Sequence, residues 1–407
     1  MSVTSALPKR SADQSPPPWL WPRAAYVHIP FCAHHCGYCD FAVVTGADDR
    51  IEAYLDALEC EFSTLGEPQP VETIFIGGGT PTYLSAGQLQ RLLTAIQNWL
   101  PPARSASEGS SSSLARALGW SEFSIESTPE SLTAEKVLVL ADHGVDRVSI
   151  GVQSFDPRAL AVLERIHSPD DVPRAIALVR RRIDNVSLDL IFGVPGQTLR
   201  DWDNDLKQAL AFAPEHVSTY GLTYETGTRL WKQRRRGLVQ ALDEDAELAM
   251  YLHSLDTLAA AGLPQYEVSN HARPSRECRH NRTYWANHAY WGFGVGAARY
   301  VNGRREVNTR SLPDYLKRLR DGKPATAQSE ELAPEERARE TISVQLRRVE
   351  GIDRAGFVGQ TGYNLDALAG AVIAHHVGAE LLADDGARVR LTRRGYCVAD
   401  SLIADFF

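Results

Sequence analysis

The sequence has no long hydrophobic run: nowhere do eighteen apolar residues follow one another, so no segment is predicted to span a membrane. The first 22 residues lack the apolar stretch of a secretory signal and are rich in serine and proline, which predicts a disordered tail over residues 1–22. Basic residues are in the minority, and the net charge of −8 argues against nucleic acid as the main partner. Two short runs of three arginines, at residues 180–182 and 234–236, are interpreted as solvated helix ends.

Cysteine is scarce, with six in 407 residues, and a chain of this length without a signal peptide is not expected to depend on disulfides. Three of the six, Cys32, Cys36 and Cys39, follow a short apolar run in a C-x3-C-x2-C pattern. A structural zinc site usually has two close ligand pairs, and no second pair follows at that spacing. Thiolates also bind iron–sulfur clusters, and three cysteines on four irons leave one iron open to a small molecule. The pattern predicts a [4Fe–4S] cluster with an open iron, in a cytoplasmic protein.

From residue 24 onward, short β-rich runs alternate with amphipathic helical stretches. Helices are predicted at residues 85–100, with Ser85 as N-cap, and at residues 133–143, closed by Gly144. The series predicts an α/β fold with a parallel sheet and right-handed crossovers, a partial TIM-type barrel that is two units short of eight. The six predicted strands cover residues 25–29, 73–76, 123–126, 147–152, 186–191 and 217–222.

The remaining segments differ in composition from the barrel pattern. The Ser-rich stretch within residues 101–118 predicts a flexible insertion. After residue 222 we expect a helix at 243–261, a strand at 266–269 and a hairpin turn at Asn302-Gly303. Beyond about residue 334, helices and a hairpin around Asp385-Gly386 predict a small helical, winged-helix-like domain. The predicted parts are the barrel at 23–240, an extension at 241–330 and the C-terminal domain at 331–407.

Polar residues recur where the predicted strands end, and in a parallel barrel these ends carry the ligand-binding residues. The run Gly-Gly-Gly-Thr-Pro-Thr at residues 77–82 follows the second strand, and its glycines let the backbone approach a ligand closely. Glu126, Gln153 and Asp189 interrupt apolar runs in the next three strands, and Arg165 follows Gln153. Two interpretations are open: a ligand cradle in which Arg165 pairs with a carboxylate, or a layer of polar side chains bonded to one another.

The cysteine motif and the glycine run, one β–α unit apart, resemble those of the radical S-adenosylmethionine (SAM) superfamily. In that family SAM binds the open iron through its amino and carboxylate groups, inside an open barrel of six strands. Bound SAM can be cleaved to a 5′-deoxyadenosyl radical, chemistry that the cofactor supplies. Thr80 stands here where many relatives carry Glu. The resemblance implies that SAM is contacted by Tyr26, Gly78, Gly79, Thr80, Glu126, Gln153, Arg165 and Asp189.

Longer segments are similar to the oxygen-independent coproporphyrinogen III oxidase group of this superfamily. This group contains true coproporphyrinogen III dehydrogenases and heme chaperones. Three features favour the heme-chaperone branch: Phe41 stands where the dehydrogenases have a further Cys, only 25 residues precede Tyr26, and His280-Asn-x-x-Tyr284 matches a chaperone motif. The segments that carry the resemblance are residues 26–41, 77–84, 144–156, 189–198 and 266–270.

The heme-chaperone resemblance implies heme as cargo, acceptor hemoproteins as partners, respiratory or membrane-associated ones among them, and homodimers under some conditions. Histidine is a common axial ligand of heme iron, so His280 is the candidate heme ligand, with Tyr284 beside it. The alternative is that both residues only shape a loop through hydrogen bonds. Two other functions stay open, a coproporphyrinogen III dehydrogenase and a class C radical SAM methyltransferase. The other cysteines are expected to be core residues: Cys60, Cys278 and Cys397.

Overall fold

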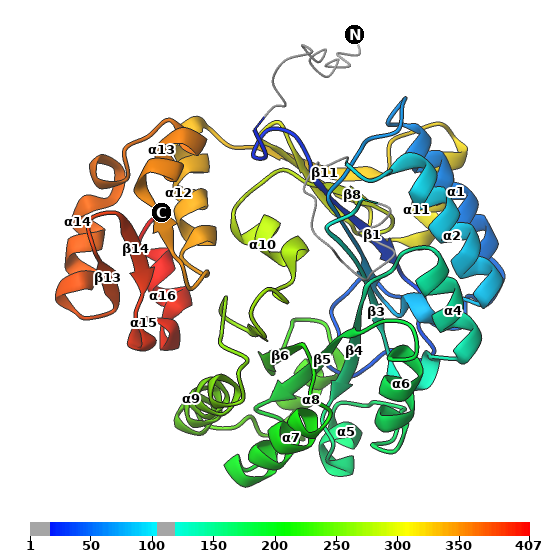
Figure 1. Cartoon of the computed structure of the whole chain (residues 1–407), viewed down its shortest axis with the longest axis horizontal. Helices are drawn as coiled ribbons and strands as arrows, with labels where there is room; N and C mark the ends of the chain where they lie inside the picture. Colours follow the sequence, from blue (N-terminus) through cyan, green and yellow to red (C-terminus); the bar gives the residue numbers. More distant parts are fainter. Residues whose placement is uncertain (1–16, 104–118) are drawn as a thin grey trace.

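The computed structural model describes residues 17–103 and 119–407, and its main feature is one eight-stranded sheet in the order β7-β6-β5-β4-β3-β2-β1-β8. Neighbouring strands are parallel, except that β7 is antiparallel to β6. The two end strands each pair with one neighbour only, so the barrel is open along one side (Figure 1). The strands are β1 Ala24–Ile29, β2 Thr73–Gly78, β3 Glu122–Ser127, β4 Arg147–Gln153, β5 Asn185–Phe192, β6 His216–Gly221, β7 Asn270–Ala272 and β8 Trp291–Phe293.

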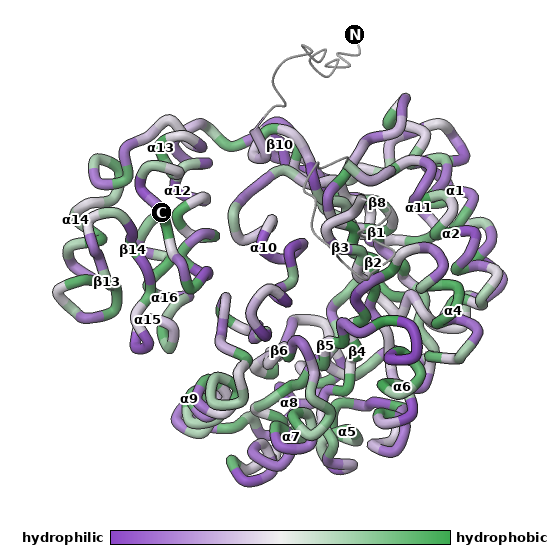
Figure 2. Tube along the Cα trace, viewed as in Figure 1, coloured by the Kyte–Doolittle hydropathy of each residue, from purple (hydrophilic) through white to green (hydrophobic). Residues whose placement is uncertain are grey.

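The six predicted strands are confirmed as β1 to β6, each within two residues of its expected ends. Most residues of these strands are buried, as expected of a parallel sheet that is covered on both faces. In β4, for example, six of seven residues are buried. Figure 2 shows hydrophobic and hydrophilic stretches along both the strands and the surrounding helices. The barrel therefore has one continuous core between its sheet and the outer helices.

The connecting helices lie around the sheet (Figure 1), and the three predicted at 85–100, 133–143 and 243–261 are confirmed as α2, α4 and α9. The side chain of Ser85 accepts a hydrogen bond from Gln88 N–H in the first turn of α2, and that of Thr133 accepts one from Lys136 N–H in α4. Each side chain thus satisfies an N–H group that has no partner within its helix. Gly144 has a φ of +83° just past α4, as expected for a helix stop. The helices are α1 Ile51–Ser63, α2 Ala86–Trp99, α4 Ala134–Asp142, α5 Pro157–Val162, α6 Asp171–Val179, α7 Leu199–Ala211, α8 Arg229–Arg235 and α9 Glu244–Ala260.

Beyond the barrel, the chain forms a small antiparallel sheet and a C-terminal unit with a core of its own. The predicted turn at Asn302-Gly303 joins β9 Ala298–Val301 to β10 Arg304–Asn308, with a positive φ at both turn residues. The predicted hairpin at Asp385-Gly386 joins β13 to β14. The other elements are α10 Arg279–Trp285, α11 Leu312–Arg320, β11 Thr326–Glu331, α12 Pro334–Gln345, β12 Ile352–Asp353, α13 Arg354–Thr361, α14 Leu365–Gly378, β13 Leu382–Asp384, β14 Arg388–Leu391, α15 Arg393–Cys397 and α16 Ala399–Ala404.

Two local expectations differ from the structure. The strand predicted at 266–269 is wrong, because β6 pairs instead with the next residues, Asn270–Ala272, while Tyr266 turns its hydroxyl to His216 Nε2 (2.9 Å). Residues 17–22 form a turn, and Ala289 N–H donates to Pro18 O (2.9 Å), so this part of the predicted tail is structured. Residues 1–16 of that tail and 104–118 of the predicted insertion lie outside the described residues. In the part of the chain that the structure describes, no helix is both long and apolar enough to cross a bilayer.

Candidate functional site

The three predicted cluster cysteines lie on the loop that leaves the carboxyl end of β1. At its base, Cys32 N–H donates to Val44 O (3.0 Å) and Val44 N–H donates to Pro30 O (2.8 Å). Within the loop, Cys39 N–H donates to Cys36 O (3.2 Å). Cys32 is buried, the other two cysteines are half-buried, and all three are free thiols. The loop therefore presents its thiols together in a partly enclosed place, as cluster binding requires.

Burial and mutual proximity disfavour the charged form of these thiols. Burial, with a smaller effect of the neighbouring thiols, raises the pKa of Cys32 to about 12 and the pKa of Cys39 to about 11. A bound metal replaces such protons, because ligating cysteines are thiolates. Within residues 17–103 and 119–407, no three His, Cys, Asp or Glu side chains converge on a single metal ion. Three thiols on one loop are ligands of the kind that an iron–sulfur cluster takes.

The glycine run after β2 packs directly against the cysteine loop. Gly79 N–H donates to Ile29 O (2.8 Å), and Thr80 N–H donates to Phe31 O (2.9 Å). A Cβ at Gly79 would stand 2.9 Å from Cys32 Sγ and from both of those carbonyl oxygens, so only glycine fits there. Thr80 Oγ1 lies 3.5 Å from the same sulfur. The run is therefore a support for the cysteine loop, and the N–H groups expected to serve a ligand are used inside the protein.

His28 belongs to this site although the sequence analysis did not single it out. Its buried ring places Nε2 2.9 Å from Ala42 O, beyond the third cysteine, and Nδ1 3.0 Å from the hydroxyl of Tyr26. Gly78 has a φ of +108°, and a Cβ there would overlap the His28 ring. Burial lowers the pKa of His28 to about 4, so the ring is neutral at pH 7. His28 ties β1 to the far arm of the cysteine loop; a polar residue inside an apolar strand was the only sequence signal.

Arg165 and Gln153 lie at the carboxyl end of β4, beside the second cysteine. Arg165 Nη1 is 3.5 Å from Cys36 Sγ, and Nη2 donates to Gly151 O (2.8 Å). Gln153 has a φ of +63° where the register between β4 and β5 shifts, and such a bulge re-aims the side chain. Gln153 Oε1 is buried and accepts no hydrogen bond from the described residues. This unpaired acceptor fits a ligand that brings a donor to the end of β4.

The two predicted carboxylates have different surroundings. Glu126 accepts one hydrogen bond, from Gly78 N–H (2.9 Å), and burial raises its pKa to about 7. Asp189 accepts hydrogen bonds of 2.7–3.5 Å from the hydroxyls of Ser149, Ser187 and Ser218. Asp189 therefore matches the interpretation of polar side chains bonded to one another, whereas Glu126 keeps most of its accepting capacity for a ligand.

The predicted heme residues, His280 and Tyr284, lie on α10, which packs against β2. His280 Nδ1 is 3.1 Å from Thr73 Oγ1, and Nε2 is 2.7 Å from the hydroxyl of Tyr284. The residue is 0% exposed, and its ring centre is 5.4 Å from that of Phe75. Burial lowers the pKa of His280 to about 3. Both ring nitrogens are engaged, so the arrangement matches the alternative in which the two residues shape the local structure.

Glu122, at the start of β3, anchors the beginning of α10. Its carboxylate accepts hydrogen bonds from Arg279 N–H (2.8 Å), His280 N–H (3.4 Å) and Cys278 Sγ (3.2 Å). A carboxylate at a helix N-terminus satisfies free N–H groups and interacts favourably with the helix dipole. Cys278 is a core residue, as expected. Cys60 is exposed and Cys397 is half-buried, so the same expectation is wrong for these two cysteines, which lie on the outer sides of their helices.

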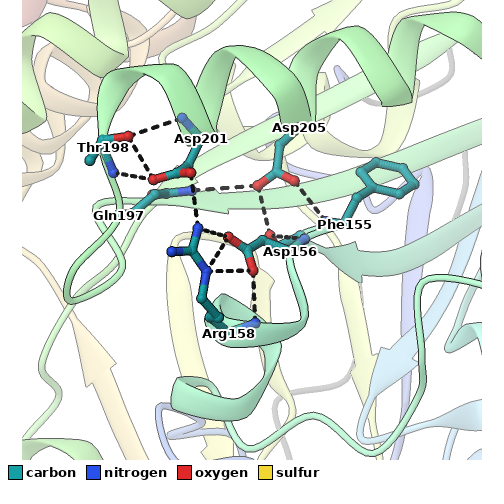
Figure 3. Close-up of polar contacts among 8 residues, drawn as sticks. Phe155, Asp156, Arg158, Gln197, Thr198, Asp201 and Asp205 are labelled. Carbon is teal, nitrogen blue, oxygen red and sulfur yellow. Dashed lines mark hydrogen bonds and ion pairs between the residues drawn. The ribbon is translucent and has the colours of Figure 1, made fainter.

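A second polar group, which the sequence analysis also missed, holds the loop that follows Gln153 (Figure 3). Asp205 of α7 is buried, and its carboxylate accepts from Ser154 Oγ and Phe155 N–H, both at 2.7 Å. Burial raises the pKa of Asp205 to about 6. At the surface of the same contact, Arg158 pairs with two carboxylates, those of Asp156 and Asp201. These contacts fix the chain after β4 against α7.

An open parallel barrel, with three free cysteines after its first strand and a glycine support after its second, defines a protein of the radical SAM class. The profile of the Radical SAM superfamily matches residues 26–209, and that of the HemN C-terminal domain matches residues 332–398. Such proteins bind a [4Fe–4S] cluster and SAM, and the residues described above fit both groups.

Relatives with similar sequences show to which family of the radical SAM class the chain belongs. The heme chaperone HemW of Bacillus subtilis is 35% identical over 94% of this chain and 99% of its own length. HemW of Escherichia coli is 33% identical over 86% of this chain and 89% of its own length. The chain belongs to the HemW family. Among solved structures, the coproporphyrinogen III oxidase HemN of Escherichia coli, a radical SAM enzyme, matches with a TM-score of 0.80 over 95% of this chain and 90% of that one; at 21% identity this shows a shared fold.

Proposed function

We propose that this protein is a radical SAM heme chaperone, which binds a [4Fe–4S] cluster, SAM and heme and passes heme to acceptor hemoproteins. The heme part is supported by the relatives named as heme chaperones, which align with nearly the whole chain. The cluster part is carried by one observation: Gly79 lies so close to Cys32 that the support and the cysteine loop form one unit. A loop braced in this way holds three thiols in place before any metal arrives.

The cofactor roles follow from what each side chain still has to offer. Gln153 Oε1 and the carboxylate of Glu126 would accept hydrogen bonds from amino or hydroxyl groups of SAM. Arg165 would pair with its carboxylate, close to the iron that no cysteine holds. SAM on the cluster supplies radical chemistry if it is cleaved, while the barrel orients it and excludes water. Tyr26, Gly78, Gly79, Thr80 and Asp189 are further proposed SAM contacts through the family resemblance alone, since the hydrogen bonds of the glycine run and of Asp189 are used inside the protein. The proposed cluster ligands are Cys32, Cys36 and Cys39.

The test of this function is a heme titration of the anaerobically reconstituted protein, followed by mixing with the apo-form of a b-type cytochrome. We expect saturable heme absorption and its transfer to the cytochrome at a rate above that of free heme. Absence of saturable binding by protein that holds its cluster would refute the chaperone function. A Cys32→Ser variant separates the two parts, because it lacks the cluster but keeps the rest of the chain.

For heme itself, we propose that His280 and Tyr284 act only through the position of α10. His280→Ala should bind heme with unchanged stoichiometry and spectrum per folded molecule, and should unfold at lower urea concentration. A variant with the wild-type circular dichroism spectrum but no heme absorption would instead identify His280 as a direct ligand.

The fold shared with HemN supports a second candidate, a coproporphyrinogen III dehydrogenase. Anaerobic incubation of the reconstituted protein with coproporphyrinogen III, SAM and a reductant tests it. We expect no protoporphyrinogen, and its formation would overturn the chaperone assignment.

We further propose a cytoplasmic location, acceptors among respiratory or membrane-associated hemoproteins, and a homodimer that forms under some conditions. Light scattering with and without heme would detect the dimer, and a single monomeric mass in both would refute it.

A further inference from the structure

The two arginine runs of the sequence lie in different electrostatic surroundings. At the end of α6, Arg180 pairs with Glu215 (3.5 Å) and Arg182 pairs with Asp142 (3.0 Å), as expected of a solvated helix end. The run at 234–236 closes α8, whose residues include no carboxylate. Within the described parts of the chain, no carboxylate oxygen lies within 4.0 Å of the side-chain nitrogens of that run. The second run is therefore not explained as a paired helix end.

The basic face of α8 consists of Arg229, Lys232, Arg234, Arg235 and Arg236, and all five residues are exposed. Arg234 lies over the ring of Tyr224 (4.5 Å) and Arg235 over that of Trp231 (4.9 Å), which holds their charged groups at the surface. Among the described residues, an ion-pair partner is found for Arg229 alone of these five, namely Glu164 (2.9 Å). The acidic first turn of α9 comes next in the chain. The charge of Arg234 acts to lower the pKa of Glu247 in that turn, but the two side chains form no ion pair. A local excess of positive charge thus stands on a chain with a net charge of −8.

The first residues of α8 contact the cysteine loop directly. Leu230 N–H donates to Gly37 O (2.8 Å), and Arg229 Nη2 donates to His35 O (2.6 Å), so α8 holds the loop on both sides of Cys36. Leu230 is only 1% exposed and packs into a small core with residues of β5 and α5. The apolar side of α8 is therefore used inside the protein, while its basic side faces solvent beside the proposed cluster.

We propose that the basic face of α8 is the docking surface for an acidic protein that delivers one electron to the cluster. The inference depends on the proposed cluster. One electron leaves the reduced carrier, such as a flavin hydroquinone that becomes a semiquinone, and enters the cluster without any bond made or broken. Electron-transfer complexes bury little surface and depend on opposite charge to guide encounter. A positive patch on an acidic protein guides an acidic carrier to one place, next to the loop that it must reach.

An anionic bilayer is the other surface that a basic helix attracts. Helices that lie in a membrane interface insert an apolar face, whereas α8 has only seven residues, of which Leu230 is buried and Trp231 has Arg235 over its ring (4.9 Å). Contact with the cysteine loop also has no use in membrane binding. The structure therefore favours the protein carrier.

The test compares two charge-reversed variants by stopped-flow reduction with an acidic flavodoxin in its hydroquinone form. Lys232→Glu with Arg236→Glu alters exposed side chains of the basic face that form no hydrogen bond or ion pair with the described residues, so we expect the fold to be kept. Arg181→Glu with Lys323→Glu is the matched control, since it makes the same charge change at two exposed basic residues outside α8 that form no ion pair within the described parts of the chain. At low ionic strength we expect the reduction rate of the first variant to be at least about tenfold lower than that of wild type. The difference should vanish at about 1 M salt. The control should match wild type, and dithionite should reduce all three equally.

Flavodoxin affinity for the cluster-free chain gives a readout that needs no cofactor, and it should weaken in the first variant only. Equal reduction rates and equal affinities in wild type and the first variant would overturn the docking surface. So would a defect confined to binding vesicles of phosphatidylglycerol, which would assign this face to a membrane. A wild type that takes up no iron on reconstitution would refute the proposed cluster, a failure that the affinity measurement distinguishes from a failure of docking.

Discussion

Two glycines of the site, Gly78 and Gly79, stand where a single methyl group would collide with its surroundings. At Gly78 the obstacle is the ring of His28, and at Gly79 it is Cys32 and the main chain of the cysteine loop. Side chains bring the chemistry of this site, but the close contact of two loops decides where that chemistry lies. Residues without a side chain are therefore as sensitive here as the cysteines.

Gly79→Ala should separate the two loops and reduce iron content without unfolding the barrel. The added Cβ cannot approach Cys32 Sγ and two carbonyl oxygens to 2.9 Å without displacing them. Iron and sulfide analysis after anaerobic reconstitution measures the effect, with circular dichroism as the check on folding. Gly87→Ala is the control, because nothing lies within 4 Å of a Cβ there and alanine favours the α2 helix. Full iron content in Gly79→Ala would contradict the close fit described here.

Glu122→Ala should destabilise the protein by about 2–4 kcal/mol, because it leaves buried donors at the start of α10 without an acceptor. Urea unfolding measures the loss, and hydrogen exchange of residues 279–285 locates it. Glu122→Gln keeps an acceptor oxygen and should lose less than half as much. If both variants matched wild type, the carboxylate would not be the anchor of α10.

At the scale of elements, loops between strands are held by helices far away in the sequence. Asp205 of α7 receives two hydrogen bonds from the chain just after β4, fifty residues earlier (Figure 3). The strained Gln153 stands directly before this contact, so the helix helps to keep the end of β4 in its bulged shape.

Asp205 also predicts a pH dependence of stability. Burial raises its pKa from 3.8 to about 6, so the folded chain keeps this proton while the unfolded chain releases it. The contribution of Asp205 is therefore complete below pH 4 and is lost as the pH rises through 6, by an amount on the order of 2–3 kcal/mol. Urea unfolding between pH 4 and 7 should show wild type losing stability relative to Asp205→Asn, which does not titrate. Parallel curves for the two proteins would show that Asp205 does not keep its proton on folding.

The elements that the sequence predicted correctly are those whose signal is local. Strands β1 to β6 are short β-rich runs between helical stretches, and α2 begins after its N-cap Ser85, whose capping contacts span three residues. β8 has only three residues, too few for a pattern, and β7 was placed four residues early because its partner strand, rather than its own composition, selects Asn270–Ala272. The contacts of Glu122 and Asp205 join distant segments, and no spacing in the sequence announces them.

At the scale of the whole molecule, the proposed ligands connect β1, β2, β3 and β4, so their binding should stabilise the entire barrel. SAM at a hundredfold excess over its dissociation constant should add about 2.7 kcal/mol to the stability of the reconstituted protein. Anaerobic thermal unfolding, with and without SAM, detects this as a higher Tm. The gain should disappear in Cys36→Ser and after chelation of iron. An equal gain in Cys36→Ser would place SAM away from the cluster.

The missing ladder between β7 and β8 gives the wall of the barrel a mechanical property. A fully closed barrel has a girth set by its strand count, and stretching it breaks main-chain hydrogen bonds that contribute about 1 kcal/mol each. In this protein the two edge strands, β7 and β8, can move apart while the hydrogen bonds between all paired strands stay intact. The width of the barrel can therefore adjust at the gap between these two strands, narrowing around a small ligand and widening around a broad, rigid one.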